Sequence, residues 1–294
     1  MDQLLEKKHI VDLSKAYIDL HMHTTASDGS LSPRQLVQEA KNAGLSIISV
    51  TDHDTIDGIN EALEAGEELG VTVIPGIEIS TEFKPEMHIL GYFRRENCSR
   101  IEDVAARLVE YRNERNPKII LKLNELGLDI SMDEVKRASG GEIVGRPHFA
   151  MVLKEKGYAA SLKEAFEVFL GTRGLAYFKK EKLTPEEGIM EIKKADGVAI
   201  LAHPGLLGIG RESMDEFVGH LVEWGLGGIE VYYPEHDEEL TQYLERLAVR
   251  LGIIATGGSD FHGALKDDIR LGVGHGNLNV PVSAAVELIK ALHI

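Results

Sequence analysis

The chain has 294 residues, 43% of them hydrophobic, with a net charge of −16 and a single cysteine. This length allows one large domain or a domain with an insertion, and one cysteine excludes an internal disulfide or a site of several thiolates. The acidic surface argues against duplex DNA as a partner. The sequence has neither an apolar run of the roughly 20 residues that a membrane span needs nor a signal-peptide core, so we expect a cytoplasmic protein.

Strand-like and helix-like segments alternate in the first third of the chain. Helices are predicted at residues 32–45, with Ser32 as N-cap and Pro33 at the first helical position, and at 56–70. Apolar, β-rich runs predict strands at residues 17–23, 46–54, 71–80 and 87–93.

The middle of the chain differs, because it has several helical patterns and little strand signal. Residues 101–127 form a long amphipathic pattern, and residues 161–171 predict a further helix. The alternation resumes after residue 195, with strands at 197–204, 227–234 and 252–262 and helices at about 213–224 and 237–251.

Such alternation favours a parallel α/β barrel or sheet. We therefore expect an α/β fold in four parts: an N-terminal extension at 1–16, the first part of the α/β domain at 17–96, a helical insertion at 97–182 and the second part of the α/β domain at 183–294.

Histidines and acidic residues occur in or just beyond these apolar runs. The carboxyl ends of parallel strands gather at one edge of a sheet, and residues i and i+2 of a strand face the same side. One such residue alone is more often a hydrogen-bonded structural group, but burying many together without ions would be costly. The candidate metal ligands are His21, His23, Asp28, His53, Glu78, His88, His203, Asp260 and His262.

Imidazoles and carboxylates without thiolates are typical of Zn²⁺, Mn²⁺ or Fe²⁺ sites. Nine ligands exceed what one ion with four to six ligands can use, so with a bridging carboxylate we expect two or three divalent ions (Mn, Zn or Fe). Ions about 4 Å apart or less form a hydrolytic centre, in which a hydroxide that bridges two ions attacks phosphorus.

The motifs HMH…D, TDHD, PGIEIS, HILGY, AHP and GSDFH, which span residues 18–262, closely resemble those of the PHP family, named for polymerase and histidinol phosphatase. The resemblance implies a distorted (βα)7 barrel with a trinuclear metal centre. It implies three ligand sets: His21, His23, Glu78 and Asp260; Glu78, His88 and His203, with Glu78 bridging; and Asp28, His53 and His262. Among these residues we predict that His203, Asp260 and Glu78 are catalytic.

Residues 144–158, VGRPHFAMVLKEKGY, and the segment after them resemble a subfamily of stand-alone PHP phosphoesterases that act on nucleotides. Its members remove the 3′-phosphate of 3′,5′-bisphosphonucleosides such as phosphoadenosine phosphate, and some trim short RNA from the 5′ end. We expect the same hydrolysis here, with a small nucleotide or short oligonucleotide as substrate, the insertion as a substrate cap, and no obligate protein partner. Two alternatives stay open: another phosphoester substrate such as histidinol phosphate, or a non-catalytic metal-binding regulatory protein.

Four residues are candidates for substrate binding: Arg146, His148, Arg173 and Lys180. The guanidinium of Arg146 could bind a phosphate in a bidentate way. Arg173 and Lys180 belong to a basic segment that fits a solvated loop equally well. Asp52 precedes a candidate ligand, and it either orients a ligand histidine or caps the loop.

Overall fold

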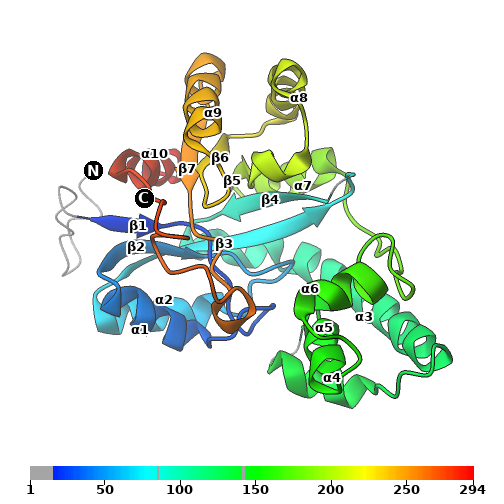
Figure 1. The fold of residues 1–294 in the computed structure, drawn as a ribbon. Helices are drawn as coiled ribbons and strands as arrows, with labels where there is room; N and C mark the ends of the chain where they lie inside the picture. The colour runs from blue at the N-terminus through cyan, green and yellow to red at the C-terminus, as the bar shows by residue number, and fades with distance from the viewer. Residues whose placement is uncertain (1–15, 85, 141–142) are drawn as a thin grey trace.

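A seven-stranded sheet forms the centre of the computed structural model, which describes residues 16–84, 86–140 and 143–294 (Figure 1). Each strand pairs with the next along the chain, in the order β1-β2-β3-β4-β5-β6-β7. The strands are β1 (Tyr17–Asp19), β2 (Leu45–Val50), β3 (Thr72–Thr81), β4 (Met87–Tyr92), β5 (Val198–Leu201), β6 (Gly228–Tyr232) and β7 (Ile254–Gly257). The predicted extension at 1–16 lies, except for Ala16, outside the described residues.

The sheet is mixed, whereas the sequence pattern favoured a parallel arrangement. β4 runs antiparallel to both β3 and β5, and the other neighbouring pairs are parallel. Only residues 82–86 separate β3 from β4, and a connection this short cannot make the crossover that parallel strands need. The first residues of β4 therefore lie beside the carboxyl ends of β3 and β5.

Helices lie on both sides of the sheet. In Figure 1, α1 and α2 lie on one side, α7, α8 and α9 lie on the other, and α3 to α6 gather beside the sheet. The α-helices are α1 (Pro33–Asn42), α2 (Ile59–Leu69), α3 (Glu102–Glu125), α4 (Met132–Ser139), α5 (Arg146–Glu155), α6 (Leu162–Ala165), α7 (Pro185–Lys194), α8 (Arg211–Trp224), α9 (Glu238–Leu251) and α10 (Val282–Leu292). Shorter helical turns are η2 (Arg95–Ile101), η3 (Phe166–Leu170), η4 (Pro204–Leu207) and η5 (Gly263–Leu265).

The start of α1 shows how local sequence sets an element. The Ser32 side chain accepts a hydrogen bond from the Gln35 backbone N–H, and the Gln35 side chain accepts one from the Ser32 N–H. Pro33 fills the first helical position, which needs no N–H donor. The predicted N-cap is thus confirmed, and α1 buries Leu36 and Ala40 in an apolar cluster shared with β2 and α2.

Two apolar clusters pack the elements that carry the predicted functional residues. Side chains of β1 to β5, such as Ile47 and Leu90, meet in one cluster that α10 covers with Leu288. Residues of α3 to α6 and η3 have a cluster of their own, which includes Ile119 and Phe149. The later part of the helical region therefore has its own apolar core, whereas the start of α3 packs against the sheet, with Leu108 in one cluster with Ile79 and Ile89.

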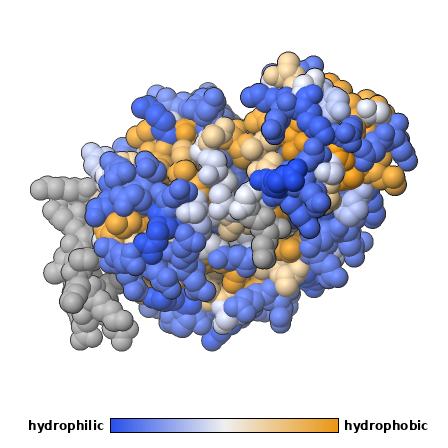
Figure 2. All heavy atoms as spheres, turned by 90° about the horizontal axis from the view of Figure 1, so that it is seen from below, coloured by the Kyte–Doolittle hydropathy of each residue, from blue (hydrophilic) through white to orange (hydrophobic). Residues whose placement is uncertain are grey.

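On the face that Figure 2 shows, hydrophilic side chains surround smaller hydrophobic areas. Among the described residues, none of the helices combines the length and apolar character that a membrane crossing requires.

Candidate metal centre

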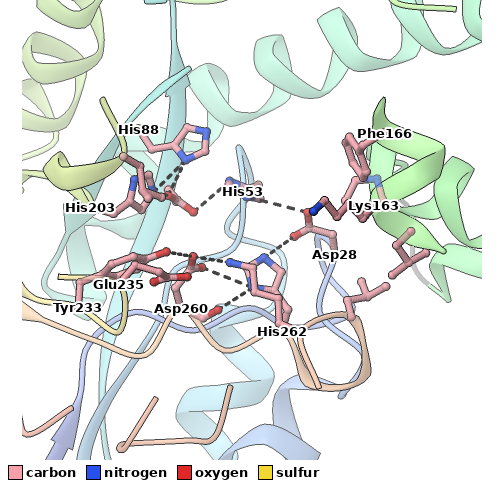
Figure 3. A pocket seen from close by; sticks show the side chains of 16 residues that line it. Asp28, His53, His88, Lys163, Phe166, His203, Tyr233, Glu235, Asp260 and His262 are labelled. Atoms are coloured by element: carbon pink, nitrogen blue, oxygen red, sulfur yellow. Dashed lines mark hydrogen bonds and ion pairs between the residues drawn. The ribbon is translucent and has the colours of Figure 1, made fainter. Parts of the chain in front are cut away.

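All nine predicted ligands meet at one end of the sheet, as Figure 3 shows for six of them. Four follow directly on strands: His21 and His23 come after β1, His53 after β2 and His203 after β5. Glu78 lies within β3 and pairs with Leu90 of β4. His88 reaches the same place from the start of β4, because that strand is antiparallel to its neighbours. The last ligands, Asp260 and His262, come after β7, and Asp28 lies in the turn before α1.

Glu78 is the centre of this arrangement, and its carboxylate is almost fully buried. One oxygen, Oε1, lies 2.8 Å from His88 Nδ1 and 3.1 Å from His203 Nε2. The other, Oε2, faces three further imidazoles: it is 3.3 Å from His21 Nε2, 3.1 Å from His23 Nε2 and 3.0 Å from His53 Nδ1. A carboxylate with nitrogen atoms around both oxygens is placed to bridge two cations.

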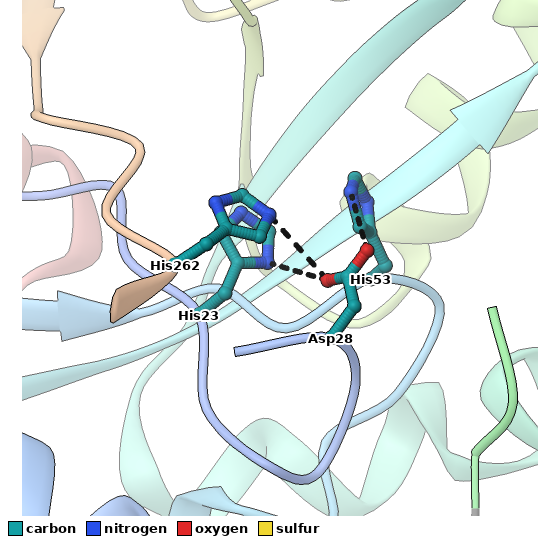
Figure 4. A group of neighbouring side chains, drawn as sticks. All are labelled: His23, Asp28, His53 and His262. Carbon is teal, nitrogen blue, oxygen red and sulfur yellow. Dashed lines mark ion pairs between the residues drawn. The ribbon is translucent and has the colours of Figure 1, made fainter. Parts of the chain in front are cut away.

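The potential ligand atoms form three overlapping groups in which all members lie within 4.8 Å of one another. The groups are His21, His23, Glu78 and Asp260; His23, Asp28, His53 and His262 (Figure 4); and His53, Glu78 and His88. The first group is the first predicted set, and the second contains the third predicted set with His23 added. The third shares Glu78 and His88 with the second predicted set, and His203 Nε2 lies 3.3 Å from His88 Nδ1.

Unpartnered polar atoms show that the site fits divalent ions. Among the described residues, seven buried side-chain N and O atoms have no hydrogen-bond partner, and six of them belong to His21, His23, His53, Glu78 and His203. Leaving such an atom unpartnered costs about 1–3 kcal/mol. Ions bound by nitrogen and oxygen atoms would satisfy these atoms, and imidazole with carboxylate is a donor set that Zn²⁺, Mn²⁺ and Fe²⁺ accept.

The close packing of rings and carboxylates shifts their pKa values strongly. Burial alone would raise the pKa of Glu78, but the imidazoles of His53 and His88 hold it well below its usual range. Burial lowers the pKa of His23, yet the carboxylates of Asp260 and Glu78 beside its Nε2 raise it to about 9. By contrast, burial lowers the pKa of His53 to about 3. The cluster is thus a network in which neighbouring rings cannot all be protonated together.

Glu230, which was not predicted from the sequence, orients two of the predicted ligands. This fully buried carboxylate on β6 lies 3.0 Å from His21 Nδ1 through Oε1, and its Oε2 accepts a hydrogen bond of 2.7 Å from the His203 N–H. It fixes the His21 ring with Nε2 turned towards Glu78. The available signal was a lone acid inside the apolar strand GGIEVYY.

Asp260 is held on its outer side by two residues that the sequence analysis did not assign to the site. The Tyr233 hydroxyl donates to Asp260 Oδ2 at 2.9 Å, and Lys266 Nζ lies 2.6 Å from the same oxygen. The other oxygen, Oδ1, is left near His21 and His23. The backbone of Asp260 has a φ of +53°, which is uncommon outside glycine and marks local strain at the end of β7.

The two aspartates that flank His53 have different partners. Asp52 accepts hydrogen bonds from the Thr24 N–H and hydroxyl and from the Ser27 hydroxyl, so it caps the turn that carries Asp28. Of its two predicted roles, loop capping is the one that the hydrogen bonds show.

Asp54 is bound on the other side, by groups of the helical region and the segment after it. It pairs with Arg112 of α3 and with Lys180, and it accepts a hydrogen bond from the Ser80 N–H. This buried ionic cluster joins α3 to the strand that carries Glu78.

The four predicted substrate-binding residues have different partners. Arg146 Nη2 lies 2.8 Å from Glu86 Oε2, and Lys180 is buried against Asp54. His148 accepts a hydrogen bond from the Gly145 N–H at 3.0 Å and lines a cavity beside the metal cluster. Arg173 is exposed and is not part of the lining of the metal pocket.

A pocket of about 400 Å³ opens onto the predicted ligands (Figure 3). Its walls include Lys266 and Tyr233 from the sheet side and Pro147, Lys163 and Phe166 from the helical region. Two lysines, Lys163 and Lys266, therefore lie in the same pocket as the predicted ligands, and neither was predicted from the sequence.

Comparisons with known proteins point to one family. The model of the PHP domain matches residues 19–196. A 5′-3′ exoribonuclease from Haemophilus influenzae is 33% identical over 85% of this chain and 91% of its own. A phosphoribosyl 1,2-cyclic phosphate 1,2-diphosphodiesterase from Eggerthella lenta is 32% identical over 83% of this chain and 94% of its own.

A 3′,5′-nucleoside bisphosphate phosphatase from Chromobacterium violaceum is 28% identical over 84% of this chain and 87% of its own. Among solved structures, one from Bifidobacterium adolescentis, assigned as a metal-dependent phosphoesterase, aligns with a TM-score of 0.83 and 29% identity. That alignment covers 94% of this chain and 96% of the other.

Proposed function

Because the chain belongs to the PHP family and is a metal-dependent phosphoesterase, we propose that it removes the 3′-phosphate of 3′,5′-bisphosphonucleosides such as phosphoadenosine phosphate. The main structural support for hydrolytic activity is the set of three overlapping groups of potential ligands around Glu78. The substrate rests on likeness to the Chromobacterium violaceum phosphatase.

In this proposal the nine residues would hold two or three divalent ions, in the three sets that the resemblance to the PHP family implies. Glu78 bridges the first two sets, and His23 lies close enough to serve the third as well. When bound, such ions supply Lewis-acid chemistry, since they make hydroxide available near neutral pH and offset charge on phosphoryl oxygens.

The chain's own residues hold the site in shape and bind the substrate. Glu230 and Asp19 hydrogen-bond to segments that carry the predicted ligands. Asp19 accepts hydrogen bonds from the N–H and hydroxyl of Ser259, the residue before Asp260. Lys266 lines the pocket and would offset charge on the phosphate. The leaving ribose oxygen takes a proton either from His203, which lines the pocket, or from a water.

We also propose that the sheet is a distorted (βα)7 barrel. The segments after β1 and β7 exchange backbone hydrogen bonds, at 3.2 Å from the Leu20 N–H to the Gly257 carbonyl and 2.8 Å from the Asp260 N–H to the His21 carbonyl. The interior apolar cluster of β1 to β5 supports the same proposal.

The helical region at 97–182 would then be an insertion between the barrel parts 17–96 and 183–294. Pro147, Lys163 and Phe166 of this region line the pocket, which is the placement expected of a substrate cap.

A second candidate function is the trimming of short RNA from the 5′ end. It rests on likeness to the Haemophilus influenzae exoribonuclease and would use the same metal centre. The two functions differ only in what is attached to the phosphate that is cleaved.

The test is a product assay on the full chain after reconstitution with Mn²⁺, Zn²⁺ or Fe²⁺. The substrates are phosphoadenosine phosphate, histidinol phosphate and a short 5′-phosphorylated RNA, and the His23→Ala protein, purified in parallel, controls for contaminating phosphatases. We expect the highest kcat/KM with phosphoadenosine phosphate. Equal or faster turnover of histidinol phosphate would refute the proposed substrate.

A further inference from the structure

A second cavity, of about 570 Å³, adjoins the metal pocket and takes no part in the chemistry described above. Leu162 and Leu265 line both cavities. Its other walls come from the turn between β1 and α1, through Ser30, and from α4 and α5, through Met151. The same turn carries Asp28, which lines the metal pocket, so this turn contributes residues to both cavities.

His148 presents a hydrogen-bond donor of defined tautomer to this second cavity. Its Nδ1 accepts a hydrogen bond from the Gly145 N–H at 3.0 Å. Burial lowers the pKa of His148 to about 4, so the ring is neutral at pH 7 and carries its proton on Nε2. Among the described residues, this N–H has no hydrogen-bond partner, although the ring lines the cavity.

The lining of the second cavity suits a nucleoside better than a phosphate. Apolar side chains such as Met151, Leu162 and Ala138 form part of the wall, and the polar groups beside them include His148 and Thr25. The charged residues of the lining, Lys154 and Glu155, have opposite signs. An apolar wall with a few placed polar groups is typical of small-molecule sites of this size. The metal pocket, by contrast, is lined largely by histidines, acids and lysines.

We propose that the second cavity binds a second nucleoside, joined through its 5′ oxygen to the phosphate that the metal centre hydrolyses. The inference rests on the proposed function, because that phosphate must lie at the metal cluster. The bond that breaks is unchanged: water adds its oxygen to phosphorus, the P–O3′ bond breaks, and the 3′ oxygen leaves with a proton. A bisphosphonucleoside releases inorganic phosphate, whereas an oligonucleotide releases the next nucleotide with a 5′-phosphate.

The test fills the second cavity and leaves the metal pocket open. Met151→Trp and Ala138→Trp each place an indole in the cavity from a different helix, and Met190→Trp is the matched control, because Met190 is 44% exposed on α7, outside both cavities. For each metal-loaded full-length protein, kcat/KM is measured with phosphoadenosine phosphate and with a 5′-phosphorylated adenosine dinucleotide. Circular dichroism selects the variants that keep the wild-type fold. Two cavity variants are made so that one remains for the test when the other does not fold.

We expect the cavity variants to lose roughly tenfold more kcat/KM with the dinucleotide than with the mononucleotide, since the indole clashes only with the second nucleoside. Met190→Trp should leave the ratio at its wild-type value. Equal losses with both substrates, or none, would overturn the inference while the proposed function stands. If the wild-type protein turns over neither nucleotide, the proposed function fails and this inference fails with it.

Discussion

Replacing Glu230 with glutamine tests whether a residue that hydrogen-bonds to predicted ligands affects the affinity for metal ions. Glu230 is fully buried, and its two oxygens serve His21 Nδ1 at 3.0 Å and the His203 N–H at 2.7 Å. Glutamine keeps one oxygen for the His203 N–H but turns an NH₂ donor towards the His21 ring. The ring must then either rotate, which moves Nε2 from its place beside Glu78, or change tautomer, which puts the proton on Nε2 and removes the lone pair that a metal needs.

Losing a group that orients a ligand histidine typically weakens metal binding by about 10–100-fold, which corresponds to about 1.4–2.7 kcal/mol. We expect a loss in this range for Glu230→Gln, measured by competition with a chromophoric chelator for Zn²⁺. Glu245→Gln is the matched control, because Glu245 accepts a hydrogen bond from Tyr232 of the same strand but has no contact with the cluster. A folded Glu230→Gln protein that binds Zn²⁺ as tightly as this control would refute the reasoning.

Three further predictions concern turnover, pH and stability. His23→Ala should reduce turnover to background in a folded protein, while His220→Ala, at an exposed histidine of α8, should keep wild-type kcat. The pKa of His23 is raised to about 9 in the metal-free protein, so its proton must leave before a metal binds. Metal affinity in the chelator assay should therefore rise from about pH 6.5 to about pH 9. An affinity that does not change with pH would contradict this. Arg112→Met removes one partner of the buried Asp54 carboxylate and should lower the free energy of unfolding in urea by about 3–5 kcal/mol. The control Arg100→Met, at an exposed pair, should lower it by about 1 kcal/mol or less. Equal losses would show that the buried cluster does not stabilise the fold.

Elements set by neighbouring residues were predictable from the sequence. The capping box at Ser32 and the proline after it define the start of α1 without help from the rest of the fold. The helices near 213–224 and 237–251 correspond to α8 and α9 for a similar reason, since each ends at a glycine with positive φ. The convergence of the predicted ligands was predictable because most of them follow strands whose carboxyl ends share one edge.

Features that depend on distant partners were not predictable. Strand direction depends on the connection, so the antiparallel course of β4 was missed although the strand itself was found. Lys180 was predicted either to bind substrate or to lie in a solvated loop, because nothing near it in the sequence reveals its buried partner Asp54. Glu230 was missed because a single acid in a strand has no local pattern to distinguish it from an ordinary polar residue.

The most direct test of the central claim is anomalous X-ray scattering from crystals of the full chain grown with Mn²⁺ or Zn²⁺. The proposed centre predicts two or three anomalous peaks, with one on either side of the Glu78 carboxylate and each within bonding distance of histidine nitrogens. Ordered ligand side chains without any peak among them, in crystals that contain the metal in excess, would contradict the claim that these residues form a hydrolytic metal centre.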